Sequence, residues 1–311
     1  MASVKHIQNH IAESKLTLPV VAVYGVVVWL LAGVVANHWW PQLFCFALST
    51  YLLIELNNSN ALIRVYSRTV SCSFIGLTCT APFLFGSLSG GVVQLCFIAA
   101  VLLLFQTYQD ETSTGRCFYA FAAIGVGSLF FVQIFYYVPV LWLLMLTNLL
   151  CMKWRTFLAS VLGLLAPYWF VTAYLVYFGD PMSLVDHFAA LGHWSAPFDL
   201  TVLSDSQVLV LALCLLLALT GIVHFWRNSY HDKIRIRLLY GCFTVLVLFT
   251  AALLLLQPQH YSVLIRLLIV VTSPLIGHFL ALTYTRISNI AFFAITLATL
   301  ALTVYNLWMP L

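Results

Sequence analysis

The sequence predicts an all-α membrane protein, a polytopic bundle of about eleven transmembrane helices, and three observations carry this prediction. Of the 311 residues, 63% are hydrophobic and 7% are charged, whereas a soluble domain carries about 25% charged residues. Apolar runs that approach the ~20 residues needed to cross a bilayer recur along the whole chain. The Lys and Arg residues lie singly or in small groups between these runs, which indicates topology determinants and excludes a nucleic-acid partner.

Polar and turn residues bound the apolar runs and so place the helices. In chain order, the expected spans are 18–36, 40–56, 70–86, 90–106, 117–131, 134–150, 154–178, 206–224, 237–257, 262–283 and 286–308. The first run is longer than the roughly 7 to 15 apolar residues of a signal peptide, so we expect a retained anchor. Residues 1–17 form a cytoplasmic segment, either a flexible tail or a short surface helix with Val4, Ile7 and Ile11 at helical spacing.

The stretch 117–150 is long for one span and short for two. Either two tight helices meet near Gln133 to Pro139, or a half-helix pair enters and leaves the same face of the membrane. The aromatic residues of this stretch fit helix packing with an interfacial belt, or a groove for an isoprenoid or acyl chain; they are Phe130, Phe131, Phe135, Tyr136 and Tyr137.

Basic residues predict the orientation, because Lys and Arg accumulate in short cytoplasmic loops. With a cytoplasmic N-terminus, every basic residue except Arg266 falls on the cytoplasmic side. The longest outer loop, 179–205, carries four aspartates and neither Lys nor Arg. We therefore expect a single transmembrane domain over residues 1–311, multi-pass in a bacterial inner membrane, with the C-terminus outside the cytoplasm.

Arg266 is the sharpest candidate for a ligand site. A guanidinium about one turn into an outer helix end either snorkels to the headgroups or binds a lipid phosphate, with His260 and Tyr261 just before it. His278 lies twelve residues later, ~18 Å along an ideal helix, so it cannot share a small site with Arg266. We expect His278 to be a buried, hydrogen-bonded histidine.

The outer loop offers the catalytic candidates Asp186, His187 and His193, which could form an acid/base cluster. The alternative is an amphipathic interfacial segment that keeps its aspartates in water. The eight cysteines show neither a C-x-x-C pair nor a nearby ligand histidine, so we expect no metal site and interpret them as apolar packing residues. No cofactor-binding motif is present either, and no cofactor is expected.

A cytoplasmic polar cluster follows the second expected helix. It comprises Glu55, Asn57, Asn58 and Arg64. Either an ion pair between Glu55 and Arg64 pins the loop, or the cluster binds a cytoplasmic ligand. No Asp or Glu lies near the centre of an expected span, which argues against ion-coupled transport.

Three stretches carry a resemblance to a family. Residues Glu55 to Arg64, Phe131 to Pro139, and Gly277 to Trp308 resemble an uncharacterised family of multi-pass inner-membrane proteins of Bacteroidetes-type bacteria. The layout of many spans with one longer outer loop is also similar to polyprenyl-phosphate-sugar-dependent membrane glycosyltransferases. Those enzymes carry an acid in the first outer loop, where this chain reads Asn-His-Trp-Trp-Pro over 37–41.

Three functions follow as hypotheses. The chain handles a lipid-linked saccharide or a similar phosphate-bearing lipid in envelope biogenesis, it is a non-catalytic membrane subunit of an envelope complex, or it is an uncoupled small-molecule permease. The first implies a polyprenyl-phosphate-linked substrate, and the second implies a membrane protein partner. Whether the chain is an enzyme is left open by its residues.

Overall fold

The computed structural model of the protein describes residues 7–180, 182–194 and 198–308, and this part of the chain is helical without a strand. Thirteen α-helices follow one another. They are α1 (Ile7–Glu13), α2 (Thr17–Leu31), α3 (Trp40–Asn60), α4 (Thr69–Cys79), α5 (Leu88–Phe105), α6 (Thr114–Phe130), α7 (Tyr137–Thr147), α8 (Trp154–Phe178), α9 (Met182–Ala189), α10 (Asp205–Asn228), α11 (Ile234–Leu256), α12 (Tyr261–Leu282) and α13 (Arg286–Trp308).

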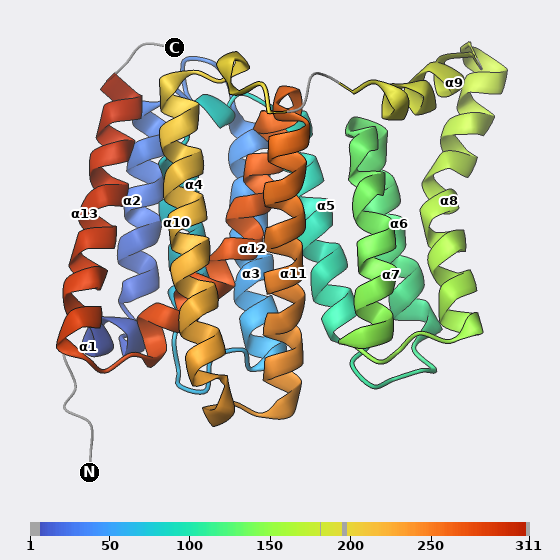
Figure 1. Cartoon of the computed structure of the whole chain (residues 1–311). Coiled ribbons are helices and arrows are strands. Elements are labelled where there is room, and N and C mark those ends of the chain that lie inside the picture. The colour runs from blue at the N-terminus through green and yellow to red at the C-terminus, as the bar shows by residue number, and fades with distance from the viewer. Residues whose placement is uncertain (1–6, 181, 195–197, 309–311) are drawn as a thin grey trace.

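The expected helical class is confirmed, because each expected apolar run corresponds to one helix among α2–α8 and α10–α13. Six of the described helices are long and apolar enough to cross a membrane, namely α5, α8, α10, α11, α12 and α13. The bent pair α1 and α2, with 85° between the two axes, qualifies as a further span if it is counted as one. Figure 1 shows the helices standing side by side, with α1 at one face of the bundle, here named the α1 face, and α9 at the opposite face.

Several helices end earlier than the apolar runs predict, and the differences are largest for α2 and α4. The run 70–86 was expected to be one helix, but α4 stops at Cys79 and a 3-10 turn, η1 (Pro82–Leu84), follows. Proline lacks the N–H that a helix interior needs and pushes the preceding residue out of the helical region, as Ala81 shows with φ −124°. The first expected span ends at Leu31 instead of residue 36, and Gly33 adopts φ +89° in the turn beyond it.

The ambiguous stretch 117–150 forms two antiparallel helices, α6 and α7. They are joined by the 3-10 helix η2 (Val132–Tyr136), which reverses the chain at the face opposite α1 (Figure 1). The helix α6 packs closely on α8, because Gly163 of α8 has no side chain. A Cβ at this position would lie 2.3 Å from the Phe118 carbonyl oxygen of α6.

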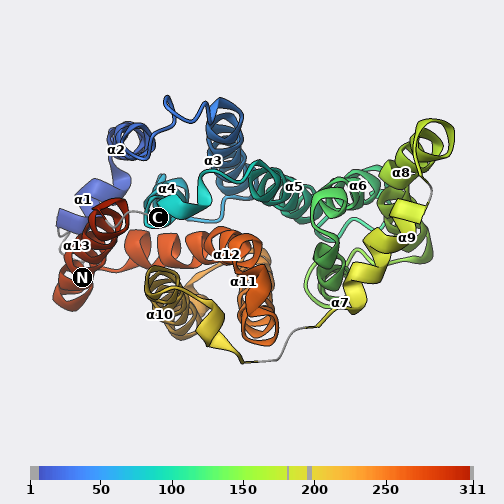
Figure 2. The same cartoon turned by 90° about the horizontal axis from the view of Figure 1, so that it is seen from above.

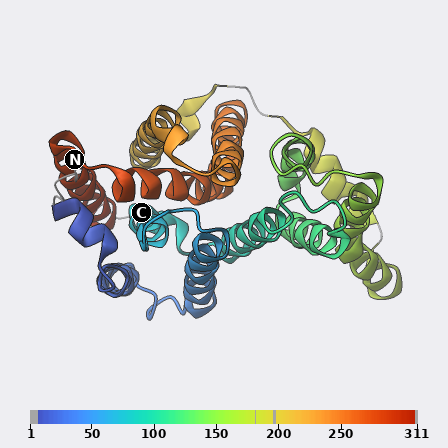
Figure 3. The same ribbon diagram turned by 90° about the horizontal axis from the view of Figure 1, so that it is seen from below.

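Helix α12 is the core of the bundle, and almost all of its residues are buried. It crosses obliquely between α4 on one side and α10 and α11 on the other, as Figure 2 and Figure 3 show from opposite ends. Glycines permit this close packing. A Cβ at Gly277 would lie 3.0 Å from the backbone of Val70 in α4, and one at Gly221 of α10 would lie 2.9 Å from Leu275.

The short N-terminal helix α1 exists, but its polar face is turned toward the bundle. Gln8 and Asn9 are buried, whereas Ile7 is 58% exposed. The Gln8 amide donates to the Leu280 carbonyl at 2.6 Å and to the Thr283 hydroxyl at 2.8 Å. Since the last carbonyls of a helix have no partner within it, α1 completes the hydrogen bonding of α12.

Candidate functional site

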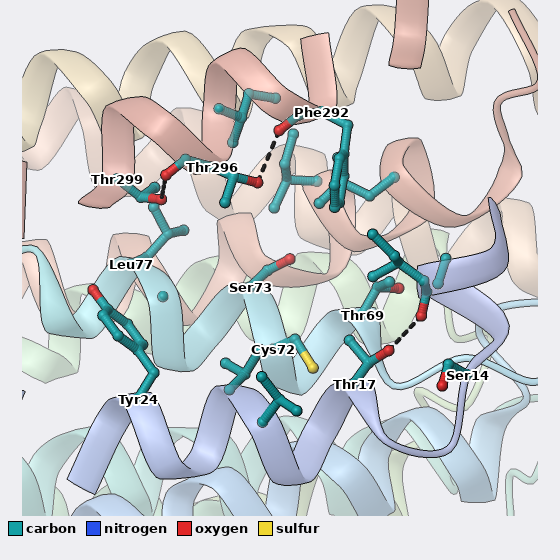
Figure 4. Close-up of a pocket in the computed structure, with 18 of the residues that line it drawn as sticks. Ser14, Thr17, Tyr24, Thr69, Cys72, Ser73, Leu77, Phe292, Thr296 and Thr299 are labelled. Carbon is teal, nitrogen blue, oxygen red and sulfur yellow. Dashed lines mark hydrogen bonds between the residues drawn. The ribbon is translucent and has the colours of Figure 1, made fainter. Parts of the chain in front are cut away.

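A groove of about 760 Å³ lies between α2 and α13. Helix α4 and the end of α12 form its floor, and α1 closes it at the α1 face (Figure 4). Val20 of α2 and Leu300 of α13 line the groove and are nevertheless 66% and 42% exposed. The groove therefore opens sideways, between α2 and α13, toward the surroundings of the bundle.

The walls of this groove suit hydrocarbon. They are mostly apolar, and most of the hydroxyl groups among them bond to the protein itself, although Ser73 Oγ has no partner among the described residues. Thr296 donates to the Phe292 carbonyl and Thr299 to the Thr296 carbonyl, both at 2.8 Å (Figure 4). Tyr24 bonds to the Thr303 hydroxyl at 2.8 Å. A wall in which most hydroxyl donors are already used presents mainly carbon to a bound molecule.

Basic side chains lie at the closed end of the groove. His10 of α1 lines it directly. Lys15 follows α1, and Arg286 begins α13, so both exposed cations stand at the α1 face of helices that line the groove. A molecule with a long apolar chain and an anionic head would meet carbon along the groove and positive charge at this end.

A buried hydrogen bond between two titratable side chains fastens the same face of the bundle. His278 of α12 places Nε2 3.0 Å from Asp232 Oδ2, and both side chains are almost fully buried. Arg64 approaches the other carboxylate oxygen at 3.9 Å and donates to the His231 carbonyl. The expectation of a buried, hydrogen-bonded His278 is confirmed. Sequence reasoning missed Asp232, although a lone acid among His and Lys residues between two apolar runs is a usable signal.

The cytoplasmic polar cluster is arranged differently from the expectation. The expected ion pair between Glu55 and Arg64 is wrong within the described residues, because Arg64 pairs with Asp232. Asn58 accepts from Arg68 at 2.8 Å, and Asn57 donates to the Ser67 carbonyl at 3.1 Å. These contacts hold the turn between α3 and α4.

The outer-loop candidates do not converge. His187 Nε2 lies 3.0 Å from the Ser128 carbonyl oxygen and 3.3 Å from the Tyr168 hydroxyl, which ties α9 to α6 and α8. Asp186 and His193 are exposed. Within the described ranges, no three His, Cys, Asp or Glu residues come together as metal ligands.

Arg266 is buried, with 6% of its surface exposed, so the snorkelling interpretation is wrong. Its guanidinium donates to the Leu84 carbonyl of η1 and, at 3.4 Å, to the Ser87 carbonyl. Tyr261 instead donates to the Gln207 carbonyl of α10 at 2.7 Å, and His260 packs its ring against Phe131. Phosphate binding by Arg266 stays a prediction, and neither His260 nor Tyr261 lines the cavity that Arg266 borders.

The fold and its long apolar helices define the class of this protein: it is a multi-pass α-helical membrane protein. No protein-family model, no curated protein and no solved structure matches the chain.

Proposed function

We propose that this protein acts in envelope biogenesis at a bacterial inner membrane, where it handles a phosphate-bearing lipid such as a lipid-linked saccharide. The observation that carries the proposal is the groove between α2 and α13. Its apolar walls fit an acyl or isoprenoid chain, and its sideways opening admits one from the bilayer. Lys15 and Arg286, at the α1 face of helices that line the groove, supply the positive charge that a phosphate head requires, and His10 lines the groove itself.

The proposed topology has about eleven crossings, with the α1 face in the cytoplasm and the C-terminus outside. Two relationships support it. The expected runs correspond one to one with α2–α8 and α10–α13, and α2 begins and α13 ends at opposite faces of the bundle (Figure 1). Helices α4 and α7 have 11 residues each, and the 3-10 turns η1 and η2 adjoin them. In this orientation, the groove opens into the cytoplasmic leaflet.

Native mass spectrometry of the purified protein tests the lipid proposal, and two glycines supply a matched pair of variants. A Cβ at Gly76 or at Gly115 meets nothing within 4 Å, but only Gly76 lines the groove. Gly76→Phe should fill the groove and abolish co-purification of a phosphate-bearing lipid, whereas Gly115→Phe should retain it. Equal lipid occupancy in both variants, or a wild-type protein free of such lipid, contradicts the proposal.

A subunit role is the second candidate, and the exposure of α8 favours it. Only 17% of the most apolar 18-residue stretch of α8 is buried within the protein, and the exposed surface of the helix carries Trp169, Phe170 and Tyr177. Aromatic residues of this kind supply large contact areas to partner proteins. A stable protein partner in the same mass spectra, lost on Phe170→Ala and kept on Gly76→Phe, would favour the subunit role.

A further inference from the structure

A second, much smaller cavity lies beside Arg266, near the face opposite α1. Its volume is about 10 Å³, and its lining comes from α2, α3, α4, α5, α12 and the turn between η1 and α5. A cavity of this size has room for about one water-sized sphere. A phosphate group does not fit in it, so this cavity is a site of another kind than the groove.

Three residues that line this small cavity carry hydrogen-bond donors without partners among the described residues. Arg266 Nε, Trp29 Nε1 and Thr78 Oγ1 are buried, and none has a hydrogen-bond partner within the described residues. The side chains of Trp29 and Thr78 are both 3% exposed. Trp29 is held in place by Phe85, whose ring stacks on the indole at 3.9 Å with an interplanar angle of 1°. Buried donors are normally paired, so three around one cavity indicate a bound species that accepts hydrogen bonds.

One acceptor also borders the cavity. Gln42 Oε1 is buried without a partner, while its amide nitrogen donates to the Gly86 carbonyl at 3.2 Å. A water molecule could accept from two donors and donate to Gln42. Hydrogen bonding alone therefore allows either a water or an anion, and the charge of the site decides between them.

The charge favours an anion. Arg266 is a permanent cation in the interior of a membrane protein, and no Asp or Glu of the described chain pairs with it. Carbonyl oxygens of Leu84 and Ser87 accept from one terminal nitrogen, but they carry only partial charge. Buried cations are otherwise paired with a negative charge in proteins.

We propose that Arg266, Trp29 and Thr78 bind a single monatomic anion, chloride under cellular conditions. The anion accepts from the guanidinium Nε–H, the indole N–H and the hydroxyl, and it neutralises the guanidinium. Because its ligands come from α2, α4 and α12, it fastens these helices to one another. The site also explains the glycine at position 90, where a Cβ would lie 2.8 Å from Arg266 Nε and displace the guanidinium.

Thermal unfolding of the detergent-solubilised full chain tests the site. Stability should rise with sodium chloride or sodium bromide, but not with sodium gluconate at equal ionic strength, because gluconate is too large for the cavity. Trp29→Phe keeps the ring and removes the N–H, and should weaken the apparent halide affinity about tenfold. Trp226→Phe, at a position 70% exposed, should leave it unchanged.

Identical melting curves in halide and gluconate would overturn the proposal, because a water-filled cavity responds to neither. A full halide response in Trp29→Phe would overturn it as well. Bromide bound to crystals should give an anomalous peak beside Arg266 Nε, and a peak elsewhere without one here also contradicts the assignment. The halide tests do not depend on the lipid groove, because the two cavities share no lining residue. The variant Gly76→Phe, which fills the groove, should therefore keep the full response to halide.

Discussion

His278 and Asp232 are 46 residues apart in the sequence, and their side chains meet at 3.0 Å in the interior of the α1 face. The pair joins the last turns of α12 to the turn between α10 and α11. Tyr240 lies beside it, with its ring 4.8 Å from the imidazole. A polar side chain buried in this way stays bound to its partner, because water cannot replace that partner.

Asp232→Asn should lower the free energy of unfolding by about 3 kcal/mol, since removing one member of a buried pair leaves the other without compensation. Arg64→Gln is the matched control, because Arg64 contacts the same carboxylate from a side chain that is 41% exposed. Its effect should stay below about 1 kcal/mol. Thermal melting in detergent compares the stabilities of the two variants. An equal loss of stability in both would contradict the prediction that Asp232→Asn is the more destabilising change.

Gln8→Leu should release α1 from the bundle, because the Leu280 carbonyl and the Thr283 hydroxyl both lose their bonds to the amide. Limited proteolysis should then cut near residue 13 at least about tenfold faster than in the wild type, the factor expected for ~1.4 kcal/mol of lost docking energy. Ile7→Ser changes an exposed residue of the same helix and should leave cleavage unchanged. Unaltered protection in Gln8→Leu would mean that other contacts hold α1.

Gly163→Ala should destabilise the packing of α6 on α8 by about 1–3 kcal/mol, because the new methyl group overlaps the Phe118 carbonyl. Gly115→Ala adds the same methyl group where nothing lies within 4 Å, and should be neutral or slightly stabilising. Chemical unfolding of the two variants in detergent measures the difference. Similar stabilities of the two variants would show that α6 and α8 can move apart to admit the methyl group without a loss of folding free energy.

A reporter fused after Leu311 should appear outside the cytoplasm, and one inserted into the loop 106–113 should appear inside it. The loop lies at the α1 face, whereas α13 ends at the opposite face (Figure 1). Paired alkaline phosphatase and green fluorescent protein fusions read the two sides separately. If both reporters were found on the same side of the membrane, the proposed number of crossings would be wrong.

Apolar runs located the helices, because a helix that crosses a bilayer requires an unbroken apolar stretch. The bounds of a helix were wrong where the helix breaks inside such a run. Pro82 is such a break, and it shortened α4. Side-chain burial was harder to predict. Depth along a helix suggested a snorkelling Arg266, but burial depends on which neighbours surround that helix, and α12 is enclosed on all sides.

Asp232 was missed for a related reason. Its position as the lone acid of a loop was a usable signal, but nothing in the loop identified the residue that it contacts. Its partner His278 lies on another helix, and only the oblique course of α12 brings the two together. The groove likewise depends on how α2 and α13 stand relative to α4, which no local pattern records.

The central position of α12 also determines the order in which the molecule can be assembled. Its polar contacts are made with Gln8, Thr69, Leu84 and Asp232, all of which precede it in the chain. During synthesis these partners are therefore already in the membrane when α12 leaves the ribosome. The helix can therefore pack at once against hydrogen-bond partners from earlier segments, so that Arg266 and His278 need never face lipid.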